Sequence, residues 1–203
     1  MSKNPVIVFE GIEGSGKSFH IANVVKYLKR KKKKFIKLRE PGGSLNSEKI
    51  RSLILNKRIE FNKNTDLLLY LAARSENIAL LKKNFRRKII LIDRFVDSTI
   101  AYQHYGFGVN RSLINSINKH LLGNLKVDFT FLNIVDKKNM LKRLNKRKNL
   151  NRYDKFDNFF YQKVQKGFLK LSKIDQNKYQ IIDSNLDKNF NKLLIIKKID
   201  KLI

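Results

Sequence analysis

The chain has 203 residues, of which 42% are hydrophobic; this is enough for one folded domain with a single core and excludes a disordered chain. It contains no cysteine and only three histidines, which excludes disulfide frameworks and thiolate metal sites and argues against a His-ligated metal centre. Lys and Arg outnumber Asp and Glu by 45 to 17, giving a net charge of +28; the lysines are spread along the chain, so we interpret most of this charge as compositional, while nucleic acid and phosphorylated small molecules stay open as partners.

Apolar runs of the buried-strand type alternate with stretches of helical periodicity along the chain. Strands are predicted at residues 5–9, 35–38, 88–92, 127–135 and 179–183. Helices are predicted after residue 18 and at residues 45–55, 65–81, 99–103, 113–122, 140–144, 156–171 and 190–202. Gly106 and Gly108 indicate a mobile loop. The alternation implies a parallel sheet with helices on both faces, and we expect one domain over residues 1–203.

A glycine-rich segment joins the first strand to the first helix. It reads Gly11, Ile12, Glu13, Gly14, Ser15, Gly16, Lys17 and Ser18, and it matches the P-loop pattern G-x-x-x-x-G-K-[ST] in the strand–turn–helix context that the pattern requires. The glycines let backbone N–H groups turn toward phosphate oxygens, and the following helix start adds its positive end. By itself the segment predicts nucleotide binding and no more; together with the five predicted strands it indicates an α/β P-loop NTPase fold with a central five-stranded parallel sheet.

Three side chains near this segment suit phosphate and metal chemistry. Lys17 can reach the β- and γ-phosphates, and the Ser18 hydroxyl suits Mg²⁺, which prefers oxygen ligands. Asp93 ends an apolar strand, where a carboxylate can hold the water shell of Mg²⁺; it can also cap the next helix. We expect Mg²⁺ as the cofactor, at Ser18 and, through water, at Asp93.

Three further motifs follow in order. Arg39-Glu40-Pro41-Gly42-Gly43 comes after the second strand, Tyr70-Leu71-Ala72-Ala73-Arg74 lies on a helix, and residues 93–103 read D-R-F-V-D-S-T-I-A-Y-Q. With the P-loop, these motifs make the chain similar to the thymidylate kinase (dTMP kinase) family, whose patterns are R-E-P-G-G, [FY]-x-A-x-R and D-R-[YFH]-x-x-S-x-x-A-Y-Q. The resemblance covers essentially the whole chain. It implies an enzyme that transfers the γ-phosphoryl group of ATP to dTMP, giving dTDP for dTTP synthesis.

The resemblance assigns the base and the sugar of dTMP to two helices. Tyr70 and Arg74 are four residues apart and therefore share a helix face; the family stacks an aromatic ring, usually Phe, on thymine and places the Arg on a base carbonyl. Thr99, Tyr102 and Gln103 are spaced to share another helix face, which in the family lies beside the base and sugar, with the Tyr disfavouring a ribose 2′-OH. The alternative for the first pair is a core Tyr70 with Arg74 either solvated or in a structural ion pair. The alternative for the second set is an ordinary amphipathic helix.

The resemblance also assigns the phosphates. Arg39 and Arg94 each lie just past a predicted strand, and arginine binds phosphate oxygens bidentately; the family places both near the acceptor phosphate and the transferred group. Glu13 is an acid inside the P-loop, and in the family such an acid faces the acceptor nucleotide and orients a neighbouring Arg. The alternatives are a surface arginine for Arg39 or Arg94 and a P-loop acid without a role for Glu13.

A basic, polar segment at about residues 142–155 is expected to form a lid. The P-loop has no Arg between Glu13 and Lys17, and family members of the bacterial type carry basic residues in the lid instead. Arg147 and Arg152, and then Arg143, are the predicted lid residues that close over ATP; a solvated basic helix end is the alternative. The lid departs from the family pattern D-R-x-E by reading Asn151-Arg152-Tyr153-Asp154.

Two other functions stay open. One is a kinase of another nucleoside monophosphate or of a deoxynucleoside. The other is a nucleic-acid-binding P-loop ATPase, which the charge suggests but no nucleic-acid-binding motif supports. No apolar run approaches the roughly 18–20 residues of a membrane span, and the first residues lack a signal-peptide pattern. We therefore expect a cytoplasmic location, ATP and dTMP as partners, no membrane partner and, by family resemblance, a homodimer.

Overall fold

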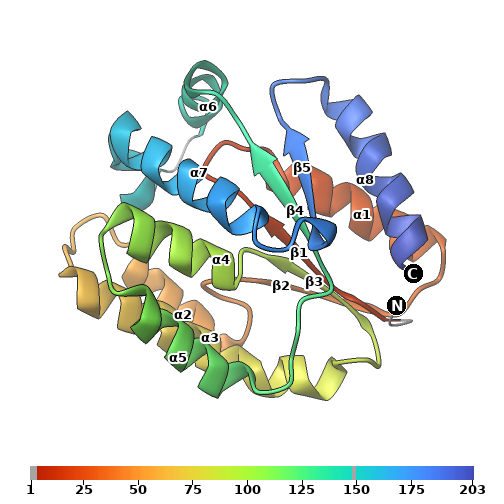
Figure 1. The fold of residues 1–203 in the computed structure, drawn as a ribbon, viewed down its shortest axis with the longest axis horizontal. Coiled ribbons are helices and arrows are strands. Elements are labelled where there is room, and N and C mark those ends of the chain that lie inside the picture. The colour runs from red at the N-terminus through yellow and green to blue at the C-terminus, as the bar shows by residue number, and fades with distance from the viewer. Residues whose placement is uncertain (1–3, 148–149) are drawn as a thin grey trace.

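The computed structural model describes residues 4–147 and 150–203. In this part of the chain, five parallel strands form one sheet in the order β2-β3-β1-β4-β5 (Figure 1). The strands are β1 (Val6–Glu10), β2 (Phe35–Arg39), β3 (Ile89–Asp93), β4 (Phe129–Ile134) and β5 (Tyr179–Asp183). The predicted α/β class with a five-stranded parallel sheet is confirmed.

Helices join the strands at close to the predicted positions. The longer ones are α1 (Lys17–Arg30), α2 (Leu45–Ile54), α3 (Lys63–Asn84), α5 (Arg111–Leu122), α6 (Lys137–Leu144), α7 (Asn158–Ser172) and α8 (Lys188–Leu202). Most of them begin at a side chain that accepts a hydrogen bond from the first turn, such as Asn62 before α3 and Asp157 before α7. These caps satisfy backbone N–H groups that have no partner within the helix.

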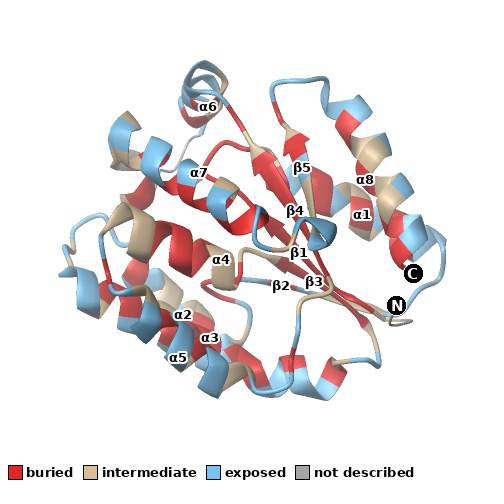
Figure 2. Ribbon diagram, in the orientation of Figure 1, coloured by how far each residue is buried: buried red, intermediate tan, exposed pale blue. Residues whose placement is uncertain are grey.

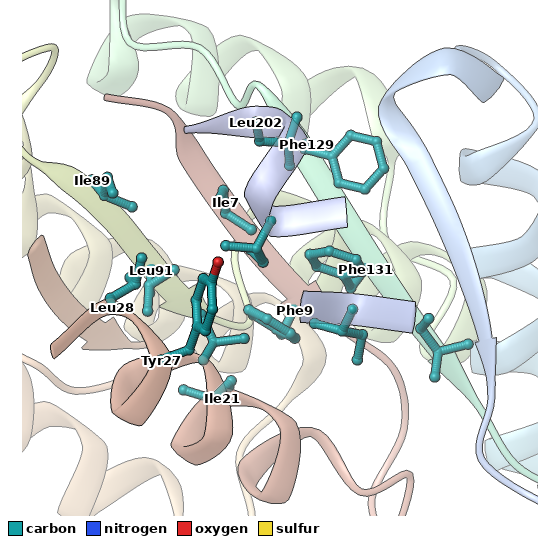
Figure 3. Close-up of a cluster of buried hydrophobic side chains, with 14 residues drawn as sticks. Ile7, Phe9, Ile21, Tyr27, Leu28, Ile89, Leu91, Phe129, Phe131 and Leu202 are labelled. Carbon is teal, nitrogen blue, oxygen red and sulfur yellow. The ribbon is translucent and has the colours of Figure 1, made fainter. Parts of the chain in front are cut away.

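Two hydrophobic layers cover the sheet. Ile7 and Phe9 of β1 belong to the cluster that α1 and α8 form on one face (Figure 3). Val6 and Val8 alternate to the other face, where they pack with residues of α3, among them Leu81. Figure 2 shows the central strands buried along their length. Because both faces are covered, these strands read as continuous apolar runs in the sequence.

The sheet topology brings two of the sequence motifs together. β1 lies between β3 and β4, and Phe9 is in register with Asp93. The P-loop leaves the carboxyl end of β1, and the Asp93–Arg94 turn leaves the carboxyl end of β3. In open α/β sheets, ligands bind outside the carboxyl ends of the strands, where successive connections run in opposite directions.

The helix predicted at residues 99–103 differs in kind from an α-helix. A short helix, α4 (Val96–Thr99), continues into the π-helix η1 (Ile100–Gly106). The Phe107 N–H donates to the Tyr102 carbonyl at 2.9 Å, five residues back. Gly106, predicted to lie in a loop, instead ends the π-helix and packs against Phe160 so closely that a Cβ would come within 2.7 Å of its ring.

The predicted lid begins in the last turn of α6 and ends in a short helix. After α6 the chain reaches a 3₁₀-helix, η2 (Arg152–Lys155), which begins with a capping box between Asn151 and Asp154. Residues 148 and 149, in the middle of the predicted lid, lie outside the described residues. A second 3₁₀-helix, η3 (Gln176–Lys178), precedes β5. In residues 4–147 and 150–203, no helix combines the length and apolar content needed to cross a bilayer.

Candidate active site

A polar pocket lies at the carboxyl ends of β1 and β3. Its walls come from the P-loop, α2, α3, α4, η1 and the predicted lid. Most of the residues predicted as site residues line this pocket: Glu13, Lys17, Ser18, Tyr70, Arg74, Asp93, Arg94, Thr99, Tyr102, Gln103 and Arg147. The other predicted residues do not line this pocket: some belong to the P-loop itself, and Arg39, Arg143 and Arg152 have partners outside it.

The P-loop backbone needs its glycines. Gly11 has a φ of +137°, and a Cβ there would lie 2.2 Å from the Asn133 carbonyl oxygen. Gly16 has a φ of +83° and immediately precedes the first helical residue of α1. Gly16 has no side chain to cap the helix, so the first N–H groups of α1 are available to an anion.

Lys17 is folded onto the loop that carries it. Its Nζ donates to the carbonyl oxygens of Gly11 at 2.8 Å and of Ile12 at 3.0 Å. Burial lowers the pKa of Lys17 to about 7, and the neighbouring Arg94 acts in the same direction. A nearby anion favours the charged form of an ammonium group, so bound phosphate would restore the charge that burial disfavours.

Asp93 and Ser18 are candidate ligands for Mg²⁺. Both line the pocket beside Lys17. Within the described residues, Asp93 Oδ1 is buried and has no hydrogen-bond partner. No group of three or more His, Asp or Glu side chains there could hold a metal alone. One carboxylate and one hydroxyl suit Mg²⁺, which keeps several waters and takes further ligands from substrate phosphates.

Arg94 is held in position by both its backbone and its side chain. Its φ is +65°, a left-handed conformation that is uncommon for residues other than glycine. The guanidinium donates to the Gly11 carbonyl and to Glu13, each at 2.8 Å, and lies over the Tyr102 ring. The Tyr102 hydroxyl donates to the second carboxylate oxygen of Glu13. The predicted pairing of Glu13 with a neighbouring Arg is therefore present in the structure.

Glu10 holds the segment after Arg94 through hydrogen bonds, and the sequence analysis did not identify it. The residue is 1% exposed, and its carboxylate accepts the N–H groups of Phe95 at 2.8 Å and Ser98 at 3.2 Å. Burial raises the pKa of Glu10 to about 7, and the charge of Asp97 adds to the effect. Glu10 thus fixes the start of α4 directly after Arg94.

Arg74 combines a place in the pocket wall with a buried network. Only 1% of the residue is exposed. Its guanidinium donates to Glu40 at 2.7 Å, Asn118 at 2.5 Å and Thr99 at 3.0 Å. The sequence left open whether Arg74 forms an ion pair or contacts the base. In the structure Arg74 forms the ion pair with Glu40 and also lines the pocket, so the ion pair does not exclude the base contact.

Tyr70 and Gln103 line the same pocket as Arg74. Tyr70 is half-buried, and its ring meets the ring of Tyr153 edge to face, with centroids 5.9 Å apart. Gln103 donates through Nε2 to Asp66 at 3.1 Å, while its Oε1 is buried without a partner in the described part of the chain. An unpaired buried acceptor beside aromatic rings is suited to a donor on a planar ligand.

Arg39 does not line the pocket. Its guanidinium is half-exposed and pairs with Glu48 of α2 at 2.8 Å. Arg51, also of α2, does line the pocket and donates to the Pro41 carbonyl at 2.6 Å. The sequence did not identify Arg51, because in a chain with 45 Lys and Arg residues nothing local distinguishes it.

The three predicted lid arginines point to three places. Arg147 lines the pocket and donates to Asp154 at 2.7 Å. Arg143 instead donates to the Gly14 carbonyl at 2.9 Å, on the outer side of the P-loop. Arg152 pairs with Asp66 and does not line the main pocket. These three arginines therefore do not form one cluster in the described part of the chain.

A second pocket adjoins the P-loop on the Arg143 side. It lies between the start of α1, α6 and the segment from β5 to α8, with Gly16, Phe19 and Leu186 in its walls. His20, also in the wall, is 3% exposed and its Nδ1 has no partner among the described residues. Burial lowers the pKa of His20 to about 4, with a smaller contribution from Arg143. Sequence analysis did not identify this pocket, because its walls come from distant segments.

The chain is similar to known proteins over nearly all its length. The family model described as thymidylate kinase matches residues 9–193. The thymidylate kinase of Thermosipho africanus is 40% identical over 179 residues, covering 87% of this chain and 88% of the relative. That of Ligilactobacillus salivarius is 36% identical over 94% of this chain and 95% of the relative. The crystal structure of thymidylate kinase from Ehrlichia chaffeensis aligns with a TM-score of 0.78 at 32% identity, covering 97% of this chain and 98% of that one.

Proposed function

The chain belongs to the thymidylate kinase family, and we propose that its main pocket transfers the γ-phosphoryl group of ATP to dTMP, giving ADP and dTDP. The observation that carries the proposal is one continuous pocket in which Lys17 and Ser18 of the P-loop face Tyr70, Arg74 and Gln103. The relatives are named thymidylate kinases, so the two alternatives from the sequence, another monophosphate kinase and a nucleic-acid-binding ATPase, are not favoured.

The P-loop side of the pocket binds ATP in this proposal. The backbone N–H groups of residues 11–18 and the start of α1 would hold the phosphates. The second pocket, which shares Gly16 with this loop, would take the base and ribose beside Arg143. Ser18 and, through water, Asp93 would hold Mg²⁺, which when bound neutralises phosphate charge.

The α3 and η1 side binds dTMP. The Tyr70 ring offers an aromatic face to thymine. Arg74 and the unpaired Oε1 of Gln103 supply a donor and an acceptor for the polar edge of the base. The Tyr102 ring, held against Glu13 and Arg94, stands where the sugar would enter.

The transfer step needs alignment more than a base. A phosphate monoester has a second pKa of about 6, so the dTMP phosphate is largely ionised at pH 7 and its oxygen can attack directly. That oxygen forms a bond to the γ-phosphorus while the bond to the β,γ-bridging oxygen breaks and ADP leaves. Lys17 and Arg94 neutralise charge on the transferred group, and their fixed positions supply most of the catalysis.

Several assignments stay predictions. Arg51 joins Arg94 as a candidate for the acceptor phosphate, whereas Arg39 would have to leave Glu48 to take that role. Arg147 is the lid cation that faces the pocket; Arg143 would act beside ATP, and Arg152 would have to leave Asp66 to act on phosphate. The single domain, the cytoplasmic location and the homodimer also stay predictions.

The first experiment is a substrate panel. ADP release with Mg·ATP is followed with dTMP, dUMP, UMP, dCMP, AMP and GMP as acceptors. A strong preference for dTMP is expected, since Tyr70, Arg74 and Gln103 suit thymine and Tyr102 crowds the 2′ position. Turnover of a different monophosphate would overturn the acceptor assignment, and ATP hydrolysis that rises only with added DNA or RNA would overturn the proposed reaction.

A further inference from the structure

Asp66 connects three elements around the acceptor side of the pocket. It lies in the first turn of α3 and is 2% exposed. Its carboxylate accepts from Gln103 Nε2 of η1 at 3.1 Å and from the Tyr153 hydroxyl of η2 at 2.6 Å. It also pairs with the guanidinium of Arg152, again from η2. Asp66 does not line the main pocket itself.

Two of the groups that Asp66 holds do line the main pocket. Tyr153 and Gln103 both contribute to its wall. The Tyr153 ring meets Tyr70 and Tyr102 edge to face, with centroid distances of 5.9 and 5.8 Å. A residue of the lid segment therefore forms one wall of the pocket assigned to dTMP, against the two rings assigned to the base and the sugar.

The electrostatics explain why these contacts belong together. A buried carboxylate is strongly destabilising unless donors and an opposite charge satisfy it. Two of the three donors of Asp66 come from η2, so moving η2 away would leave the carboxylate with Gln103 alone from this set. Arg152 is kept near Asp66 by the rings of Phe61 and Tyr153, at 5.2 and 5.0 Å from the guanidinium carbon. The carboxylate therefore favours the arrangement in which η2 is seated on the pocket.

We propose that Asp66 is a positioning residue that holds η2 on the pocket assigned to dTMP through Tyr153 and Arg152 and orients Gln103, so that affinity for dTMP depends on a carboxylate outside the pocket. The proposal rests on the assignment of this pocket to dTMP. It also gives Arg152 a role through Asp66 in place of direct contact with phosphate.

The test compares Asp66→Asn with Glu60→Gln, an exposed acid a few residues upstream that loses the same charge. We expect Asp66→Asn to raise KM for dTMP roughly tenfold, as expected for losing a charge-assisted hydrogen bond, with KM for ATP changed less than about twofold. Glu60→Gln should leave both unchanged. If Asp66→Asn changes neither KM and only lowers Tm, its role is structural and the proposal is overturned.

A second pair of variants isolates the hydroxyl contact. Tyr153→Phe keeps the ring and removes its donor to Asp66; Tyr27→Phe removes a tyrosine–aspartate hydrogen bond far from the pocket, to Asp200 of α8. Tyr153→Phe should raise KM for dTMP and speed tryptic cleavage after Arg147 and Arg152, while Tyr27→Phe should do neither. Unchanged cleavage and KM in Tyr153→Phe would overturn the seating role.

A double-mutant cycle tests how Arg152 acts. If Arg152 works through Asp66, Asp66→Ala combined with Arg152→Ala should be no worse than the more damaging single variant, within about twofold. If instead the effects of the two single variants multiply in the double variant, and Arg152→Ala lowers kcat, Arg152 acts directly on phosphate. Wild-type enzyme that fails to phosphorylate dTMP would overturn the proposed function; active wild type with unaffected Asp66 variants would overturn this inference alone.

Discussion

The P-loop side of the pocket, assigned to the phosphoryl donor ATP (the donor side), and the α3 and η1 side, assigned to the acceptor dTMP (the acceptor side), are built in different ways. On the donor side, one segment of eight residues supplies glycines, a lysine and a hydroxyl, and in our proposal its backbone N–H groups form the phosphate-binding surface. On the acceptor side, α2, α3, α4, η1 and the lid each supply one or a few side chains. Buried contacts between those side chains, such as Arg74 with Glu40 and Glu13 with Tyr102, hold the surface in place.

This difference predicts how each side responds to substitution. A backbone site depends on a few irreplaceable residues, so single changes there should abolish turnover. A site made of converging side chains shares its binding energy among many contacts. Single changes there should therefore lower affinity by smaller factors, unless they leave a buried charge without its partner.

The largest effect is expected at Lys17. Lys17→Ala should lower kcat by about 10³-fold or more, because it removes a preorganised cation beside the transferred group. The fold should persist, since the lost charge is one that burial disfavours. Steady-state kinetics and a melting curve measure both, with the exposed Lys26→Ala on the same helix as control. Near-normal turnover would refute the donor-side assignment.

Arg94 stands between the two sides, and its conservative replacement should also be severe. Arg94→Lys keeps the charge but cannot reach Gly11 and Glu13 together as the planar fork does, so kcat/KM for dTMP should fall about 10²-fold. Arg86→Lys is the matched control, because Arg86 has a similar left-handed φ of +63° and pairs with Asp128 away from the pocket. Equal effects of the two variants would mean that backbone strain, not the guanidinium, matters.

Arg51 and Arg39 are the two candidate arginines for the acceptor phosphate whose contributions can be compared directly. Arg51→Ala should raise KM for dTMP about tenfold, whereas Arg39→Ala should change it less than about threefold, since Arg39 is paired at the surface and such pairs contribute little. Both variants are assayed at saturating ATP. The opposite order would restore the role that the sequence predicts for Arg39 and would require its guanidinium to leave Glu48 on binding.

The smallest expected effect is a pH dependence of stability from His20. The pKa of His20 in the folded chain is lowered from 6.5 to about 4. Between these two pH values the His20 imidazole is therefore protonated in the unfolded chain but not in the folded chain. Stability is therefore fully present above pH 6.5 and lost as pH falls toward 4, by about 3 kcal/mol. Urea unfolding between pH 4 and 8 should show a flatter profile for His20→Gln than for wild type.

The control for this experiment is His120→Gln, which replaces an exposed histidine near the end of α5. It should keep the wild-type profile. If His20→Gln is as steep as wild type, the loss of stability in acid comes from other groups. The change should not affect the acceptor side, because His20 lies on the outer side of the P-loop.

The sequence by itself determined the features that depend on neighbouring residues. The P-loop, the order of strands and helices, and the place of Asp93 at the end of a strand follow from apolar runs, glycine spacing and caps, which act within a few residues. The pairing of Tyr70 and Arg74 in one wall follows from helix geometry in the same way. These predictions hold because the physics behind them is local.

Only the tertiary structure decided where the long charged side chains go. Arg39 meets Glu48, Arg152 meets Asp66 and Arg51 reaches the pocket. Glu10 and Asp66 become supports of the site because residues more than thirty positions away fold against them. A guanidinium or carboxylate on a flexible stem settles on whichever opposite charge or donor the fold brings within reach, and that depends on the packing of elements distant in sequence.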